Sequence, residues 1–206
     1  MLMKDKRVIR GEETYERILH SSMELISREG ISGLTASKLS KEAGISKSSL
    51  FHHFKSTKEI PLTVMEVIKG IMLESIYDEN IDSVEGIFSS FEKTLFSEDR
   101  EAQMIGRVFF SLFSEGLFKK EYFDSFKSFQ SISISRLSAL FMKTKSPGIT
   151  EEISITISKL IIASLDGLNL HSMLERENKE YIRCWNLQKK MILDYLNNGI
   201  SKGISG

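Results

Sequence analysis

Apolar residues recur along this 206-residue chain with the three- and four-residue spacing of amphipathic α-helices. The spacing predicts a first helix from Glu12 to Glu29, which Gly30 ends, and a long helix from about Lys58 to Tyr77. No segment shows the strict alternation of a half-buried strand, so we expect an all-α protein. Further helices are expected at about 82–96, 99–117, 119–143, 149–175 and 178–198, with the clearest break at Ser146-Pro147-Gly148 and less marked ones near Asp99 and Lys119.

One stripe of the first helix is apolar and should pack against the elements that follow it. Its members are Tyr15, Ile18, Leu19, Ser22, Leu25 and Ile26. The long helix at about 58–77 is apolar along one side and is long enough to contact both the segment before it and the helices after it. We therefore expect this helix to link two parts of the molecule mechanically.

Two short helices joined by a tight turn are predicted in the segment 35–60. Gly44 should end the first of them, because glycine adopts the left-handed conformation of a helix C-terminus without a steric cost. Thr35 and Ser46 each precede one of the short helices, and their side-chain oxygens can accept hydrogen bonds from its free N–H groups. Each short helix therefore has an N-cap residue.

The second short helix has an inward and an outward face. Apolar residues spaced to face inward are Leu39, Ala43, Ile45, Leu50 and Phe54, whereas Lys47, Ser48, Ser49, Phe51, His52 and His53 lie largely on the other side. The outward face has hydrogen-bond donors and no acidic residue, which suits phosphate oxygens and the acceptor-rich edge of guanine in the major groove. A helix-turn-helix binds DNA in this way, although a hairpin with a glycine turn is also common in all-α proteins.

This segment resembles the DNA-binding domain of the tetracycline-repressor-type (TetR/AcrR) transcription regulators, and the resemblance covers about the first 65 residues. That family has a long first helix, a threonine-capped second helix, a turn of the A-G-V-S type, a short recognition helix that ends in an aromatic-x-H-F element, and a lysine where the fourth helix opens. Here these elements are Glu12–Glu29, Thr35, Ala43–Ser46, Phe51–Phe54 and Lys58.

The resemblance implies an all-α fold in which residues 1–60 form a three-helix, helix-turn-helix DNA-binding domain. A long fourth helix would link it to a helical ligand-binding and dimerisation domain at 61–206. The last two long helices, 149–175 and 178–198, would pair with those of a second copy in a four-helix bundle, since they hold more apolar residues than one stripe requires. These residues include Ile153, Ile157, Leu160, Ile161, Leu165, Leu168, Trp185, Leu187, Met191, Ile192 and Tyr195.

The implied function is that of a ligand-responsive repressor. A homodimer would place two recognition helices about one DNA turn, ~34 Å, apart, so the partner would be double-stranded DNA with an inverted-repeat operator. A small hydrophobic effector in the second domain would favour a state that does not bind DNA. The implied DNA-binding residues are Lys47, Ser48 and His52 for bases or the groove, Thr35, Ser49, His53, Lys55 and Lys58 for phosphates, and Ser46 and Phe51 in the same interface.

Three departures from the family pattern bear on these contacts. Phe51 replaces a tyrosine whose hydroxyl reaches a phosphate in the family, which removes one backbone contact. Ser48 replaces a frequent glycine and adds a hydroxyl near the groove. The segment Lys55–Pro61 is one residue longer than usual before the fourth helix, and Pro61 disfavours a helical residue before it.

Charge is distributed unevenly, although 28 Lys and Arg balance 28 Asp and Glu over the whole chain. Residues 1–65 hold 11 Lys and Arg against 8 Asp and Glu, whereas the remainder holds 17 against 20. Lys4, Lys6, Arg7 and Arg10 form a basic arm that would either add phosphate or minor-groove contacts or remain a disordered terminus. The chain starts without the apolar run of a signal peptide, and no stretch approaches the ~18 apolar residues of a membrane span, so we expect a cytoplasmic protein with no membrane partner.

Reactive and metal-binding side chains are few. The single cysteine, Cys184, excludes an internal disulfide and is expected to be a buried thiol. No phosphate-binding glycine loop, nucleophile elbow or HExxH pair is present, so we expect no enzymatic activity. Neither a metal nor a cofactor is expected, because the histidines are not spaced as ligands: they are His20, His52, His53 and His171.

Aromatic residues concentrate in the second domain, which holds 11 of the 13 phenylalanines. Most of them should form the core, but apolar pockets between helices also bind small molecules. Candidates to line such a pocket are Phe91, Met104, Phe109, Phe113 and Met142.

The segment 164–171 places Asp166 and His171 in an otherwise apolar helix, and it resembles a D-G-L element in the C-terminal domain of TetR-type proteins. Buried polar groups need partners, so these two residues could contact a ligand or a second subunit, or they could face solvent. A helical small-molecule carrier without specific DNA binding is the alternative to a regulator. Salt-dependent, sequence-selective DNA binding would separate the two functions.

Overall fold

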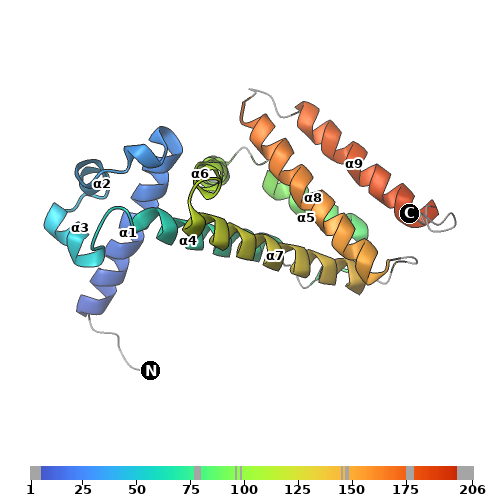
Figure 1. Ribbon diagram of the computed structural model, residues 1–206, viewed down its shortest axis with the longest axis horizontal. Helices are drawn as coiled ribbons and strands as arrows, with labels where there is room; N and C mark the ends of the chain where they lie inside the picture. Colours follow the sequence, from blue (N-terminus) through green and yellow to red (C-terminus); the bar gives the residue numbers. More distant parts are fainter. Residues whose placement is uncertain are drawn as a thin grey trace. The chain divides into compact units, whose positions relative to one another are not determined.

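The computed structural model describes residues 6–76, 80–95, 97, 99–144, 146, 149–174 and 179–198. This part of the chain is all-α, as predicted (Figure 1). The elements are α1 (Lys6–Glu29), a 3-10 turn η1 (Ile31–Gly33), α2 (Ala36–Glu42), α3 (Lys47–His53), α4 (Ile60–Ile76), α5 (Val84–Leu95), α6 (Arg100–Gly116), α7 (Lys120–Lys143), α8 (Glu151–Ser172) and α9 (Lys179–Asn198). The expected helix breaks near Asp99 and Lys119 are therefore confirmed, whereas Pro147 and Gly148 lie outside the described residues.

The chain divides into two compact units. The first comprises Met1–Gly70 and Gln103–Phe126, and the second comprises Ile71–Ala102 and Lys127–Gly206. The helices α4, α6 and α7 each run from one unit into the other. A functional boundary between residues 60 and 61 stays a prediction.

The expected apolar stripe of α1 forms much of the core of the first unit. Ile18, Leu25 and Ile26 are almost completely buried, and the buried Ser22 donates its hydroxyl to the Ile18 carbonyl at 2.6 Å. Helix α1 ends as expected at Gly30, whose φ of 70° lies in the left-handed region.

Helix α4 begins at Ile60, two residues later than predicted. Pro61 therefore occupies the first helical turn, where its missing N–H leaves no intrahelical hydrogen bond unmade. The extra length before this helix forms a short turn, in which the Glu59 N–H donates to the Ser56 carbonyl at 3.2 Å. The predicted end at Tyr77 lies outside the described residues.

A polar network around the buried Lys69 joins α4 to the beginning of α7 within the first unit. The Lys69 ammonium donates to both Glu66 carboxylate oxygens at 2.8 and 2.9 Å and to the Ser125 hydroxyl at 2.8 Å. Ser125 in turn donates to Glu66 at 2.7 Å. Burial opposes ionisation of Glu66, but the hydrogen bonds from Lys69 and Ser125 outweigh it and hold the pKa of this carboxyl below its ordinary value.

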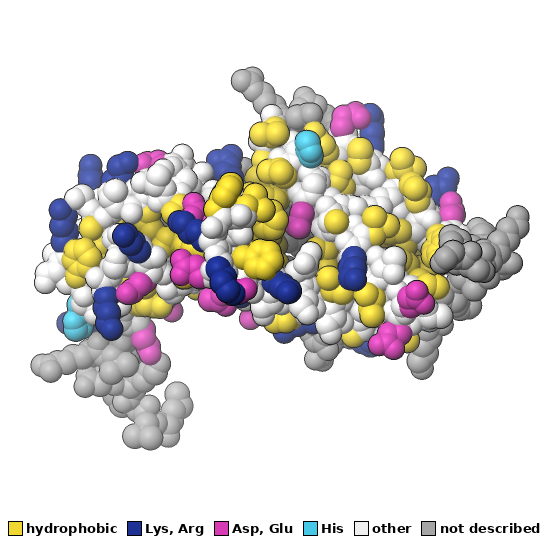
Figure 2. Space-filling view, in the orientation of Figure 1, with side chains coloured by type: hydrophobic (Ala, Val, Ile, Leu, Met, Phe, Trp, Pro, Cys, Tyr) yellow, Lys and Arg dark blue, Asp and Glu magenta, His cyan; other side chains and the backbone are white. Residues whose placement is uncertain are grey.

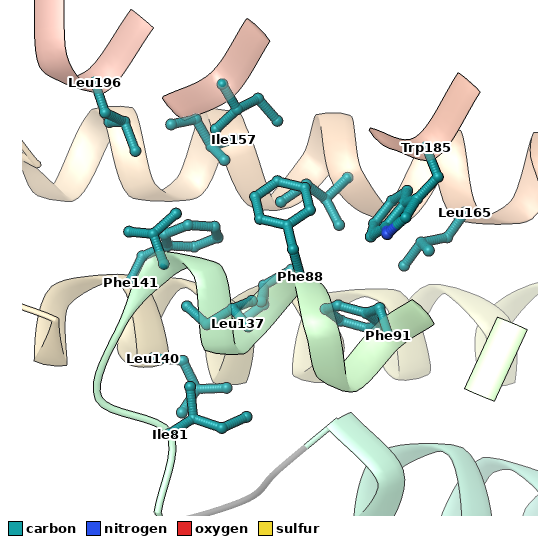
Figure 3. Close-up of a cluster of buried hydrophobic side chains, with 14 residues drawn as sticks. Ile81, Phe88, Phe91, Leu137, Leu140, Phe141, Ile157, Leu165, Trp185 and Leu196 are labelled. Atoms are coloured by element: carbon teal, nitrogen blue, oxygen red, sulfur yellow. The ribbon is translucent and has the colours of Figure 1, made fainter. Parts of the chain in front are cut away.

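The second unit has its own apolar core, built by α5, α8, α9 and the C-terminal part of α7 (Figure 3). Trp185 of α9 is fully buried and packs on Phe88 and Phe91 of α5, with ring centroids 5.2 and 6.2 Å apart. At the opposite end of the cluster, Phe141 of α7 lies beside Leu140. Four of the fourteen buried members of this core are aromatic, and three of these are phenylalanines. The prediction that most phenylalanines are core residues fails for Phe113, Phe118 and Phe123, which are exposed.

Helix α8 is, among the described residues, long and apolar enough to cross a membrane by length and composition. The expectation that no segment reaches this threshold is wrong by that measure. The finding is weak, because a core helix passes the same test, and here Ile157, Ile161 and Leu165 of α8 are buried in the core of the second unit. Packing inside the protein accounts for these three residues, although only 28% of the apolar window of α8 is buried.

Candidate nucleic-acid interface

The turn between α2 and α3 has the geometry that the sequence predicts. Gly44 adopts a φ of 63°, and the Ile45 N–H donates to the Ser40 carbonyl at 3.0 Å. Ser46 is the N-cap of α3, because its hydroxyl oxygen accepts a hydrogen bond from the Ser49 N–H at 3.0 Å. Thr35 caps α2 in the same way, by accepting from the Lys38 N–H at 3.3 Å.

Helix α3 buries one side and leaves the other open. Leu50 is completely buried and Phe54 and Ala43 are nearly so, whereas Ile45 is half-buried. The predicted outward residues Lys47, Ser48, Phe51 and His52 are exposed, while Ser49 and His53 are half-buried. The capping residues Thr35 and Ser46, and Lys55 and Lys58 after the helix, are exposed as well.

Tyr15 of α1 fixes the C-terminal end of α3, a role that the apolar pattern did not predict. Its ring stacks on Phe54, with centroids 5.3 Å apart and planes 12° apart, and lies 6.2 Å from the His53 ring. Tyr15 was expected on the inward stripe of α1, but it is partly exposed because it covers the edge of α3. The stack holds His53 and the helix end in place.

Glu29 of α1 and Glu42 of α2 are each paired with a cation. The two Glu42 carboxylate oxygens accept hydrogen bonds from Arg28 at 2.9 and 3.2 Å, and this contact holds the pKa of the Glu42 carboxyl below its ordinary value. Glu29 forms an ion pair with Lys38.

Four lysines remain available to an anion. Within the part of the chain that the structure describes, no ion pair is recorded for Lys41, Lys47, Lys55 and Lys58. Figure 2 shows Lys and Arg side chains around α2 and α3. This surface therefore presents cations and hydroxyl donors together, which suits the phosphate backbone and base edges of DNA.

A capped helix pair of this geometry, with an open face of lysine, serine and histidine in an all-α chain, defines a helix-turn-helix DNA-binding protein. Residues 18–62 match the model of the bacterial regulatory proteins of the tetR family. This segment is therefore that of a tetR-type regulatory protein, and a solved TetR-type regulator from Rhodococcus sp. shares the fold of the chain.

Similar proteins include two regulators from Bacillus subtilis (strain 168). The helix-turn-helix transcriptional regulator YerO is 31% identical over 64 residues, which are 31% of this chain and only 22% of that protein. The regulator PksA is 25% identical over 181 residues, which cover 84% of this chain and 85% of that protein. A protein from Saccharomonospora viridis, solved in complex with choline, shares the fold with a TM-score of 0.72 at 16% identity, covering 91% of this chain and 97% of that one.

The candidate effector-binding residues are distributed over both units. Met104, Phe109 and Phe113 belong to the first unit, where Phe109 and Phe113 both pack on Phe126. Their centroid distances to that ring are 5.4 and 5.2 Å. A common pocket for all the candidates stays a prediction.

In the second unit, Phe91 is buried, Met142 is exposed, and the exposed His171 stacks on Tyr181 of α9 at 6.5 Å. Asp166 is half-buried, no hydrogen bond or ion pair to a described residue is recorded for it, and burial raises the pKa of its carboxyl to about 6. The Asp166 carboxylate therefore has no recorded cation or hydrogen-bond donor among the described residues.

Two further expectations concern single positions. Cys184 is exposed on α9, so the prediction of a buried thiol is wrong, because the adjacent Trp185 occupies the inward position. In the basic arm, Arg10 is exposed on α1, whereas Lys4 and the side chains of Lys6 and Arg7 are outside the described part.

Proposed function

We propose that this chain is a transcriptional repressor that binds an inverted-repeat operator as a homodimer and is released by a small molecule. The open face of α3 carries the proposal, since Lys47, Ser48 and His52 are exposed beside a capped turn and α3 itself contains no acidic residue. In this role Lys47, Ser48 and His52 contact bases or the groove. Phosphate contacts come from Thr35, Ser49, His53, Lys55 and Lys58, and Ser46 and Phe51 lie in the same interface.

Exposed apolar side chains on the last two helices support a homodimer. Leu160 of α8 and Leu187 and Met191 of α9 are each more than half exposed. Such residues lose unfavourable contact with water when two copies pack their helices together. A twofold dimer of this kind presents two α3 helices to successive major grooves, which is why the operator is an inverted repeat.

An effector controls DNA binding in this scheme by shifting a population. The choline complex of the Saccharomonospora viridis protein supports a small-molecule site in the same fold. A ligand weakens operator binding only by as much as it prefers the non-binding state, commonly ~1 to 3 kcal/mol. Helix α4, which runs from the unit that carries α3 into the other unit, transmits this preference. The protein acts in the cytoplasm, where the DNA is.

Selection from a random DNA pool tests this function directly. The purified full-length chain is incubated with the pool at near-physiological salt, so that non-specific phosphate binding does not dominate. We expect enrichment of an inverted repeat whose half-sites are about one helical turn apart. A folded, dimeric protein that enriches no sequence would contradict the proposal and favour a small-molecule carrier.

A further inference from the structure

Phe51 is an exposed aromatic residue on the otherwise polar face of α3. Its side chain is 48% exposed, more than any other large apolar side chain described between residues 10 and 70. Tyr15, which is 36% exposed, stacks on Phe54, whereas no ring contact to a described residue is recorded for Phe51. Phe51 therefore leaves about half of its ring in water, and a surface that covers this ring would gain the free energy of burying it.

The side chains around this ring restrict what can cover it. Lys47 and Ser48 lie one helical turn before Phe51, so they share its side of α3, and both are exposed. Lys55 and Lys58 follow the helix and are exposed as well. No ion pair to a described residue is recorded for these three lysines, and α3 contains no acidic residue. An anionic partner that also presents an apolar group therefore fits this surface.

DNA presents such an apolar group at one kind of base. In the major groove the base edges carry hydrogen-bond donors and acceptors, and the C5-methyl group of thymine is the apolar exception. A phenyl ring against a phosphate would displace water from a charged oxygen and offer no hydrogen bond in return. Against a thymine methyl group both surfaces are apolar, and both lose contact with water. The missing hydroxyl of Phe51 thus favours a base over the backbone.

We propose that Phe51 is a specificity-determining residue that contacts the C5-methyl group of a thymine in each operator half-site. The proposal rests on the proposed function, because it requires α3 to be bound to DNA. It adds an apolar contact to the base or groove contacts assigned to Lys47, Ser48 and His52. The operator consequently has a T·A pair at one fixed position of each half-site, in the orientation that directs the methyl group at the ring.

Deoxyuridine tests this contact, since it forms the same base pair as thymidine and lacks only the C5-methyl group. The selected operator is prepared with deoxyuridine in place of one thymine at a time, and fluorescence anisotropy measures the affinity of the full-length chain for each duplex. We expect one position in a half-site at which the replacement weakens binding roughly 3- to 5-fold, the effect of one buried methyl group.

A second pair of operators separates the methyl group from the rest of the base. Cytosine at the sensitive position should weaken binding, because it changes the hydrogen-bonding pattern and also removes the methyl group. We expect 5-methylcytosine at the same position to bind roughly 3- to 5-fold tighter than cytosine, since it restores only the methyl group.

Variants of Phe51 assign the effect to this side chain. Phe51→Ala should bind the thymine operator more weakly than the parent chain and should no longer distinguish it from the deoxyuridine operator. Phe51→Ser replaces Phe51→Ala if circular dichroism shows the alanine variant unfolded. Phe51→Tyr keeps the ring and should keep the deoxyuridine effect. Phe118→Ala is the control, because it removes an 86% exposed ring from the turn between α6 and α7 and should change neither affinity.

The proposal is overturned if every deoxyuridine operator binds the parent chain as tightly as the thymine operator, or if the deoxyuridine effect survives the loss of the Phe51 ring. A uniform gain in affinity for Phe51→Tyr, with no deoxyuridine effect in the parent chain, would place the ring at the phosphate backbone instead. These outcomes leave the repressor function standing, because they are measured on a selected operator. A chain that selects no operator contradicts the repressor and this proposal together.

Discussion

Lys47 is the first residue of α3 and one of the proposed DNA contacts. It is exposed at the N-terminus of α3, and no ion pair to a described residue is recorded for it. Lys47→Ala should weaken binding to the selected operator by about 1–3 kcal/mol if the ammonium contacts a base, and it should relax preference at one position. Fluorescence anisotropy with single-substitution operators measures both effects.

The control is Lys127→Ala, which removes an exposed lysine from α7 in the other unit. Its operator affinity should match that of the parent chain. A uniform loss of affinity across all operators for Lys47→Ala would assign the side chain to a phosphate, and unchanged affinity would remove it from the interface.

Asp166 provides a prediction about stability and pH. Its pKa in the folded protein is about 6, above the ordinary value of 3.8, because burial disfavours the charged carboxylate. The folded state therefore holds this proton more tightly than the unfolded state, and the contribution to stability is complete below about pH 4 and lost as the pH rises to about 6.

Asp166→Asn should consequently raise the free energy of unfolding by about 2–3 kcal/mol at pH 8 and by little at pH 4. Urea unfolding at the two pH values measures this, with the exposed Asp194→Asn on α9 as the control. An equal effect of Asp166→Asn at both pH values would show that desolvation of the carboxylate is not the cause.

The burial of a side chain was predictable where only one face of its helix is apolar. It was not predictable where two faces of the helix carry apolar residues. The exposed side of α3 follows from the spacing of its apolar residues, and Lys47 and His52 lie where that spacing puts them. Helix α9 is apolar on more than one face, so the pattern did not distinguish exposed Cys184 from buried Trp185. The placement of Tyr15 depends on its contact with Phe54, which lies 39 positions further along the chain.

At the scale of elements, Gly44 is the strongest local determinant of the helix-turn-helix. Its φ of 63° is costly for a residue with a Cβ, so Gly44→Ala should destabilise the protein by about 1 kcal/mol. Chemical denaturation measures the loss. Gly70→Ala is the matched control: Gly70 lies inside α4, a Cβ there would meet no atom within 4 Å, and alanine should stabilise the helix by about 0.5–1 kcal/mol. Equal effects of the two substitutions would contradict this assignment.

The helices themselves follow closely from sequence. Thr35, Ser46 and Gly44 predict where α2 and α3 begin and end, because capping is decided by residues within one turn. The beginning of α4 was harder to predict, since Pro61 is compatible with both a helix break and a first helical turn. Ile60 is completely buried, and this burial, which no local pattern reveals, is consistent with a helix that begins there.

At the scale of the whole molecule, sequence periodicity does not predict the grouping of helices. The first unit takes up residues 103–126 in addition to the N-terminal helices. Part of the reason is chemical: Ser125 completes the hydrogen bonding of Lys69 and Glu66 across a separation of more than fifty residues.

The last prediction concerns the homodimer. Met191 of α9 is 63% exposed, and in a four-helix bundle it would be buried between two copies. Met191→Glu should convert the dimer to a monomer, because an unpaired carboxylate in an apolar interface is costly. Sedimentation velocity measures the oligomeric state.

The same variant should bind the inverted repeat with at least roughly tenfold lower affinity. Each monomer then binds one half-site on its own, and binding of the first α3 no longer holds a second α3 close to the other half-site. Phe118→Glu is the control, as Phe118 is 86% exposed but lies in the turn between α6 and α7, outside the proposed bundle. If Met191→Glu remains dimeric while Phe118→Glu becomes monomeric, the two copies associate through the α6–α7 turn. The four-helix bundle would then no longer support the prediction of an inverted-repeat operator.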